Sequence, residues 1–151
     1  MRLWLLRHGE AEPRAASDAL RELTERGRNE ARAGGERLRG AGLERILVSP
    51  LVRAQQTAEL VGEALAYQGE WETVDWITPE SDVREALRRL DAHEGRALLV
   101  VSHQPFLGDL GGWLVEGHGG QPLPMRTGSL AVLEGEAMAA GAMRLLALHH
   151  P

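Results

Sequence analysis

Residues 97–105 read Ala97-Leu98-Leu99-Val100-Val101-Ser102-His103-Gln104-Pro105, and the first five of them give the clearest strand signal in the chain. A short apolar run without alternation is typical of a strand buried on both faces, as in the centre of a parallel sheet. Two similar runs, residues 3–6 and 46–48, come earlier, and helical patterns separate the three runs. Strands that alternate with helices predict an α/β domain with a largely parallel sheet.

Signals at the ends of the helices extend this prediction along the chain. Thr24 is expected to cap a helix that reaches about Leu38. Ser49-Pro50 and Thr78-Pro79 each place a capping residue before a proline, which predicts that two more helices begin there. The remaining predicted elements are a strand within residues 71–77, a helix over residues 106–114, and a hairpin formed by residues 129–133 and 143–148.

Length and composition narrow the class of protein. The chain has 151 residues, 43% hydrophobic and 26% charged, which is typical of a single globular domain over residues 1–151. A formal charge of −5 argues against nucleic-acid binding, which requires a basic surface. No apolar stretch approaches the roughly 20 residues of a membrane span, and the apolar start is too short for a signal peptide. We therefore expect a cytoplasmic protein with neither nucleic acid nor membrane as a partner.

Two residue types are missing, and their absence restricts the chemistry. There is no cysteine, which excludes disulfides, thiolate nucleophiles and cysteine-ligated zinc. All 17 basic residues are arginine, so no lysine can form a Schiff base or contact a nucleotide phosphate in a P-loop. The terminal pair His149-His150 has no third ligand nearby, and we predict no metal site and no cofactor.

Arginine and histidine follow three of the predicted strands. The first strand leads into Arg7 and His8, the second is followed by Arg53, and the strand at residues 97–101 is followed by His103. Because ligands bind beyond the carboxyl ends of parallel strands, these four side chains are expected to converge on one pocket. Two arginines and two histidines without an acid make an anion site, and a phosphoryl group is the ligand that suits it best. The helix N-terminus near Arg53 should add to the attraction.

Histidine can also supply the nucleophile that the absent cysteine cannot. A neutral imidazole at His8 can attack phosphorus. Neighbouring arginines should lower the pKa of His8 and so keep it neutral, and they would stabilise charge on the phosphoryl oxygens in the transition state. Gly9 is expected to let the backbone pass close to the bound ligand.

These motifs together are similar to those of the histidine phosphatase superfamily, the phosphoglycerate-mutase-like branch of phosphatases. Arg7-His8-Gly9 resembles its signature, residues 18–27 resemble the entry to its first helix, and residues 48–57 and 100–105 resemble its second and third motifs. The resemblance implies a three-layer α/β/α sandwich with a six-stranded, mixed and mostly parallel sheet. It also implies that Arg7 and Arg53 bind the phosphoryl group, that His103 hydrogen-bonds it, and that His8 is phosphorylated and then hydrolysed without a metal.

Within that family, the short stretch between Arg53 and Ala97 leaves no room for the insertions that cap the pocket in mutases and sugar bisphosphatases. An open pocket is similar to that of the SixA-type phosphohistidine phosphatases. This resemblance implies a phosphorylated protein as substrate, such as the histidine phosphotransfer domain of a sensor kinase, and a role in signal transduction.

Two alternatives to this function stay open. In the larger relatives a carboxylic acid protonates the leaving alcohol, and Glu80 and Asp82 are the candidates for that general acid. With such an acid the chain would be a small-molecule phosphomonoesterase, although both residues also suit a helix start, where the dipole favours acids. A non-catalytic phospho-binding module is the third possibility, and a nucleophile between two arginines argues against it.

Overall fold

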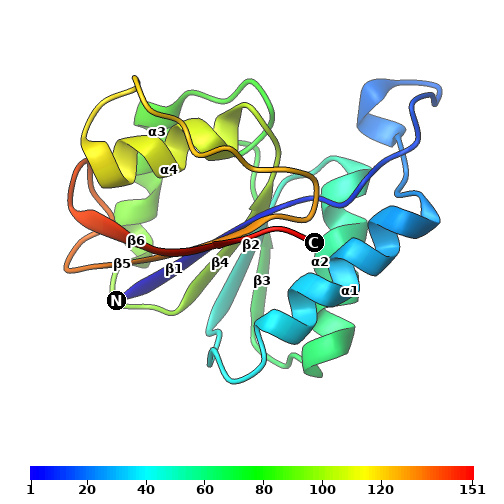
Figure 1. Ribbon diagram of the computed structural model, residues 1–151, viewed down its shortest axis with the longest axis horizontal. Helices are drawn as coiled ribbons and strands as arrows, with labels where there is room; N and C mark the ends of the chain where they lie inside the picture. The colour runs from blue at the N-terminus through cyan, green and yellow to red at the C-terminus, as the bar shows by residue number, and fades with distance from the viewer.

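The computed structural model describes residues 1–151 and contains one six-stranded sheet with the order β3-β2-β4-β1-β5-β6 (Figure 1). The first four strands in that order run parallel, and β5 is antiparallel to both of its neighbours. The strands are β1 (Arg2–Arg7), β2 (Arg45–Val48), β3 (Glu70–Thr73), β4 (Leu98–Ser102), β5 (Leu130–Gly135) and β6 (Met143–His149). The prediction of a mixed, mostly parallel sheet is therefore confirmed.

Helices cover both faces of this sheet (Figure 1). The helices α1 (Glu25–Arg37) and α2 (Val52–Leu65) cover one face, and α3 (Val83–Leu90) and α4 (Phe106–Glu116) cover the other. Two short 3₁₀ helices, η1 (Asp18–Leu20) and η2 (Asp91–His93), lie in the connections. The result is the three-layer α/β/α arrangement expected from the sequence.

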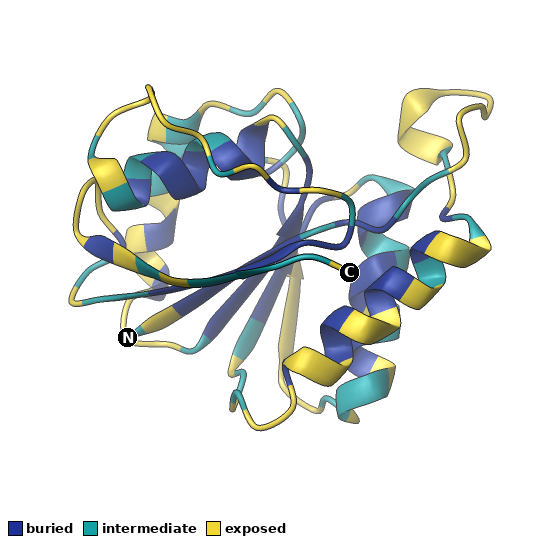
Figure 2. Ribbon diagram, in the orientation of Figure 1, coloured by how far each residue is buried: buried dark blue, intermediate teal, exposed yellow.

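The strand β4 shows why its sequence lacks alternation. All five of its residues are buried, and it lies between β2 and β1 at the centre of the parallel part of the sheet (Figure 2). Leu98 and Val100 pack into the core beneath α3 and α4, whereas Leu99 and Val101 pack into the core beneath α2. Both faces of the strand therefore need apolar side chains.

Of the four predicted helix starts, those at Thr24 and at residue 106 are confirmed and the other two are wrong. Thr24 caps α1 as expected, and its hydroxyl accepts from the Gly27 N–H at 3.0 Å. By contrast, α2 begins only at Val52: Leu51 takes the N-cap position, and Ser49-Pro50 forms a turn in which the Ser49 hydroxyl accepts from the Leu51 N–H and also contacts His103. The Thr78-Pro79 signal marks another turn, in which the Thr78 N–H donates to Ser81 Oγ at 2.8 Å, and α3 begins only at Val83.

The third strand, expected within residues 71–77, lies at the start of that region, over Glu70–Thr73. Pairing with β2 ends at Thr73, and the chain then leaves the sheet. Val74 and Ile77 are buried in the core beneath α3 and α4, so their apolar character reflects packing against that layer and not a continued strand. The predicted terminal hairpin is confirmed by the antiparallel pairing of β5 with β6.

Candidate active site

The candidate site lies at the carboxyl ends of β1, β2 and β4, which are neighbours in the sheet. The residues that follow these strands are tied together by backbone hydrogen bonds. The His8 N–H donates to the Ser102 carbonyl at 3.0 Å, and the Ser49 N–H donates to the Val101 carbonyl at 3.1 Å. Segments far apart in the sequence thus leave the sheet side by side, and the structure brings together His8, Arg7, Arg53 and His103.

His8 is held as a neutral imidazole with a defined tautomer. Its Nδ1 lies 2.7 Å from the Gly9 carbonyl, which can only accept, so Nδ1 carries the proton and Nε2 keeps a free lone pair. Burial lowers the pKa of His8 to about 4, opposed by the bond to the Gly9 carbonyl and helped by the charges of Arg53 and Arg7. A neutral ring with an unprotonated Nε2 is the form in which histidine acts as a nucleophile.

Gly9 allows the loop after β1 to pass close to the first turn of α1. A Cβ at this position would lie 2.2 Å from the carbonyl oxygen of Gly27, at the start of α1. The Gly9 N–H is also occupied, since it donates to Thr57 Oγ1 at 3.1 Å, and Thr57 in turn donates to the Arg53 carbonyl at 2.8 Å. Gly9 therefore joins the loop that carries His8 to α1 and α2, whereas the sequence suggests close approach to a ligand.

Three buried nitrogens of the site have no hydrogen-bond partner within the protein: Arg7 Nε, Arg53 Nε and His103 Nδ1. The other ends of the two guanidinium groups are fixed. Arg7 Nη1 donates to the Met125 carbonyl at 3.0 Å, and Arg53 Nη1 donates to the Asp18 carbonyl at 2.8 Å. Buried donors without partners carry a desolvation cost, and a phosphoryl group shared among them would remove it.

The imidazole of His103 is oriented by a serine. His103 is 1% exposed, its Nε2 lies 2.7 Å from Ser49 Oγ, and its ring centroid is 5.1 Å from that of His8. The Leu51 N–H already donates to Ser49 Oγ at 3.3 Å, so the serine hydroxyl can donate to His103 Nε2 and leave the proton on Nδ1. Burial, followed by the charges of His8 and Arg53, lowers the pKa of His103 to about 3.

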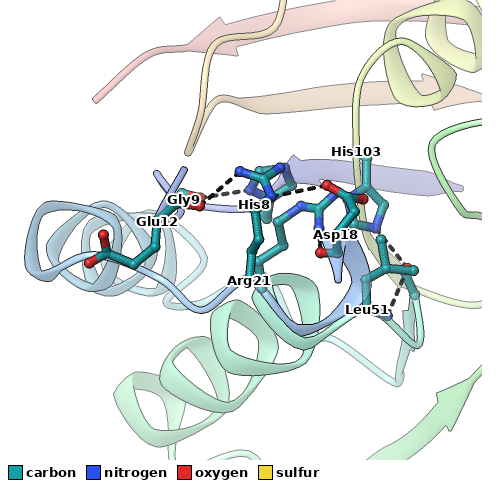
Figure 3. Close-up of polar contacts among 9 residues, drawn as sticks. His8, Gly9, Glu12, Asp18, Arg21, Leu51 and His103 are labelled. Atoms are coloured by element: carbon teal, nitrogen blue, oxygen red, sulfur yellow. Dashed lines mark hydrogen bonds and ion pairs between the residues drawn. The ribbon is translucent and has the colours of Figure 1, made fainter. Parts of the chain in front are cut away.

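Ser49 is thus a site residue that the sequence reading treated only as a helix cap. The segment 18–21 contributes two more (Figure 3). Asp18 Oδ2 lies 3.2 Å from Arg53 Nη2, and Arg21 Nε donates to Asp18 Oδ1 at 3.0 Å. Partial burial of Asp18 raises the pKa of its carboxyl, but the hydrogen bond from Arg21 and the charge of Arg53 outweigh it and lower the pKa. The salt-bridge pattern Asp18-x-x-Arg21 was visible in the sequence, but it did not reveal the contact with Arg53.

The two candidate general acids have different surroundings. Asp82 is the N-cap of α3, where its Oδ1 accepts from the Arg84 N–H at 2.8 Å. This is the helix-start role that the sequence offers as the alternative to a general acid. Glu80 lines a recess of about 260 Å³ at the mouth of the site, between η1 and the turn at Thr78-Pro79. Only Glu80 of the two therefore lies beside Asp18.

Two further observations concern metals and membranes. No group of three or more histidine, cysteine, aspartate or glutamate side chains is placed to hold a metal ion. No helix is both long enough and apolar enough to cross a membrane.

Comparison with known proteins matches residues 3–76 to the model of the histidine phosphatase superfamily (branch 1). The chain is 42% identical over 115 residues to the phosphohistidine phosphatase SixA of Escherichia coli (strain K12), covering 73% of this chain and 71% of that one. It is 37% identical over 122 residues to the SixA homolog of Haemophilus influenzae, covering 73% and 74%.

Structural comparison points the same way. A structure of the protein histidine phosphatase SixA complexed with tungstate superimposes with a TM-score of 0.88 and 35% identity, over 98% of this chain and 96% of that one. The expected phosphoglycerate-mutase-like α/β fold is confirmed by this match. From its sequence, its sheet and the match of both to known members, the chain belongs to the histidine phosphatase superfamily.

Proposed function

We propose that this protein is a phosphohistidine phosphatase that works through a covalent intermediate on His8. The observation that carries the proposal is that buried nitrogens of Arg7, Arg53 and His103 lack a hydrogen-bond partner within the protein and belong to residues gathered around a neutral His8. The similarity to SixA supports the choice of substrate, and the tungstate in the SixA structure is an oxyanion of the kind such a site would hold.

The first chemical step transfers the phosphoryl group to the enzyme. The Nε2 lone pair of His8 attacks phosphorus, the bond between phosphorus and the substrate nitrogen breaks, and its electron pair returns to the substrate imidazole. Arg7 and Arg53 stabilise the charge on the transferred oxygens, and His103 donates through Nδ1. The Gly9 carbonyl accepts from Nδ1 of His8, which stabilises the positive charge that the ring acquires.

The second step returns the enzyme to its starting state. Water attacks the phosphorus of phosphohistidine at His8, the P–N bond breaks, and its electron pair goes back to Nε2. Both protons of the attacking water stay on the product, which leaves as dihydrogen phosphate. The His8 ring is again neutral with its proton on Nδ1, so the cycle needs neither a metal nor an external base.

The proposed substrate is a phosphorylated protein, and specifically a histidine phosphotransfer domain. The connection between α2 and α3 adds only β3 and a turn, so no inserted segment lies across the strand ends. A protruding phosphohistidine side chain could therefore reach His8 from a folded surface. The proposal includes a single domain over residues 1–151 and a cytoplasmic location.

The test compares three substrates: a phosphohistidine protein, phosphoramidate and a sugar phosphate. We expect hydrolysis of the first two, unchanged by EDTA, and a ³²P-labelled enzyme that can be trapped in the wild type but not in His8→Ala. A preference for the sugar phosphate would favour the phosphomonoesterase alternative. Absence of turnover with retained phosphate binding would favour the non-catalytic binding module.

A further inference from the structure

The recess beside the phosphoryl site is lined by two acids. Asp18 and Glu80 face it together with the apolar side chains of Leu51 and Pro79. Asp18 joins the recess to the phosphoryl site directly, because its carboxylate contacts Arg53 at 3.2 Å. The leaving group of a bound phosphoryl substrate has to lie next to the phosphoryl group, and this recess is adjacent to it.

Asp18 is available to a substrate. Its side chain is 65% exposed, and it lies in the projecting segment that contains η1 (Figure 2). The arginine contacts lower the pKa of its carboxyl, so the group is ionised at neutral pH. An ionised carboxylate accepts hydrogen bonds but has no proton to donate as a general acid. Each carboxylate oxygen makes one of these arginine contacts and keeps capacity for another hydrogen bond.

The chemistry of phosphohistidine calls for such an acceptor. An imidazole that leaves with the P–N electron pair becomes a strongly basic anion unless its other ring nitrogen carries a proton. The reactive substrate is therefore a ring with the phosphoryl group on one nitrogen and a proton on the other, and it leaves as neutral imidazole. A phosphomonoester leaving group, by contrast, gains negative charge, which the carboxylates of Asp18 and Glu80 would repel.

From this placement we propose that Asp18 is a specificity-determining residue that accepts a hydrogen bond from the protonated ring nitrogen of the substrate imidazole. This inference rests on the proposed function. It gives the substrate ring the same kind of partner that the Gly9 carbonyl gives His8, so both imidazoles between which phosphorus moves are stabilised as N–H donors. The apolar Leu51 and Pro79 would contact the faces or edges of the ring.

The experiment measures the wild type and Asp18→Asn on phosphoimidazole, on a phosphohistidine protein and on p-nitrophenyl phosphate, whose leaving group departs as an anion. Asparagine keeps an oxygen that can accept from Arg53, and it removes the charge. We expect kcat/KM on the two phosphoimidazole-type substrates to fall about 10- to 100-fold, the loss expected for one charged hydrogen bond. Turnover of p-nitrophenyl phosphate should stay the same or rise.

Two further readouts separate recognition from a structural role. The basic limb of the pH profile on phosphoimidazole should move to lower pH in Asp18→Asn, because the bound ring loses the partner that holds its proton, and Asp18→Glu should restore part of the activity. Glu12→Gln is the matched control. Glu12 lies in the same loop and contacts Arg21 only through its backbone carbonyl, and its carboxylate points away from the site (Figure 3). We expect no change in its rates.

The outcomes distinguish failure of this inference from failure of the proposed function on which it rests. A wild type that hydrolyses phosphoimidazole, together with an Asp18→Asn variant that loses all substrates equally, would overturn the role of Asp18 and leave the phosphohistidine phosphatase in place. A wild type that hydrolyses p-nitrophenyl phosphate alone would overturn both. Thermal unfolding of each variant shows whether any general loss of rate comes from unfolding.

Discussion

Removal of the Ser49 hydroxyl should lower both the stability of the protein and its rate of hydrolysis. A control serine outside the site then shows how much of the loss in rate comes from the loss in stability. In Ser49→Ala, two groups lose their partner: the buried His103 Nε2, which lies 2.7 Å from the hydroxyl oxygen, and the half-buried Leu51 N–H, which lies 3.3 Å from it. A buried polar group without a partner costs about 1–3 kcal/mol. We therefore expect the free energy of unfolding to fall by about 1–3 kcal/mol, since the longer bond to Leu51 contributes little.

The rate should fall as well as the stability. Without the serine, the ring of His103 is free to carry its proton on Nε2, and Nδ1 then points at the phosphoryl group as an acceptor. Loss of a charge-assisted hydrogen bond of about 1.5–3 kcal/mol lowers kcat/KM about 10- to 100-fold. The assay is hydrolysis of a phosphohistidine protein alongside urea unfolding at the same pH.

Ser129→Ala is the matched control for this experiment. Ser129 is also fully buried, its hydroxyl also lies within hydrogen-bond distance of a histidine, His150 Nδ1 at 2.6 Å, and it also accepts from a backbone N–H, that of Arg126 at 2.9 Å. We expect a similar loss of stability with normal turnover. Full activity in Ser49→Ala, or an equal loss of activity in Ser129→Ala, would refute the argument about the tautomer of His103.

Three more results are expected. Arg53→Ala should lose roughly 3 kcal/mol of transition-state stabilisation, seen as a fall of about 100-fold in kcat/KM, and lysine should restore little of it because it lacks the planar fork. Gly9→Ala should lower the melting temperature, since its Cβ would lie 2.2 Å from the Gly27 carbonyl oxygen, and a normal melting curve would contradict that packing. The pKa values of His8 and His103 are lowered to about 4 and about 3 in the folded protein. Below about pH 6.5 the unfolded chain therefore binds protons that the folded protein does not, and stability should fall as the pH drops towards 4. Urea unfolding at pH 7 and pH 5 measures this fall, which should be smaller in a variant with glutamine at both positions.

The sequence predicted the sheet well because its signals are local. Apolar runs such as residues 97–101 are long enough to define strands, and the position of the ligand relative to parallel strands is a general rule that placed His8 and His103 together. The two helix starts failed for the opposite reason. A serine before a proline has the local chemistry of a cap, but the turn at Ser49 ends before α2 begins, and its contact with His103 exists only because the paired strands β2 and β4 bring the two residues together.

The segment around Asp18 could not be read from the sequence for a related reason. Its i, i+3 pair with Arg21 is a common surface pattern, and such pairs usually contribute little. Its contact with Arg53 depends on how the connection between β1 and α1 lies over the N-terminus of α2, and no local propensity determines that path. The strand-end rule places residues that directly follow parallel strands, such as His8 and His103, but it does not place residues of a long connection, such as Asp18.

The position of β1 also has a consequence for how the protein is made. This strand leads into the proposed nucleophile, His8, and precedes both of its neighbours in the sequence, because Leu3 pairs with Leu98 on one side and with Leu133 on the other. During synthesis an apolar strand must therefore wait, without either neighbour, until β4 and then β5 leave the ribosome. Such long-range pairing favours slow folding and exposes the strand to aggregation in the meantime. The nascent chain can thus complete this part of the sheet only after β4 and β5 have been made.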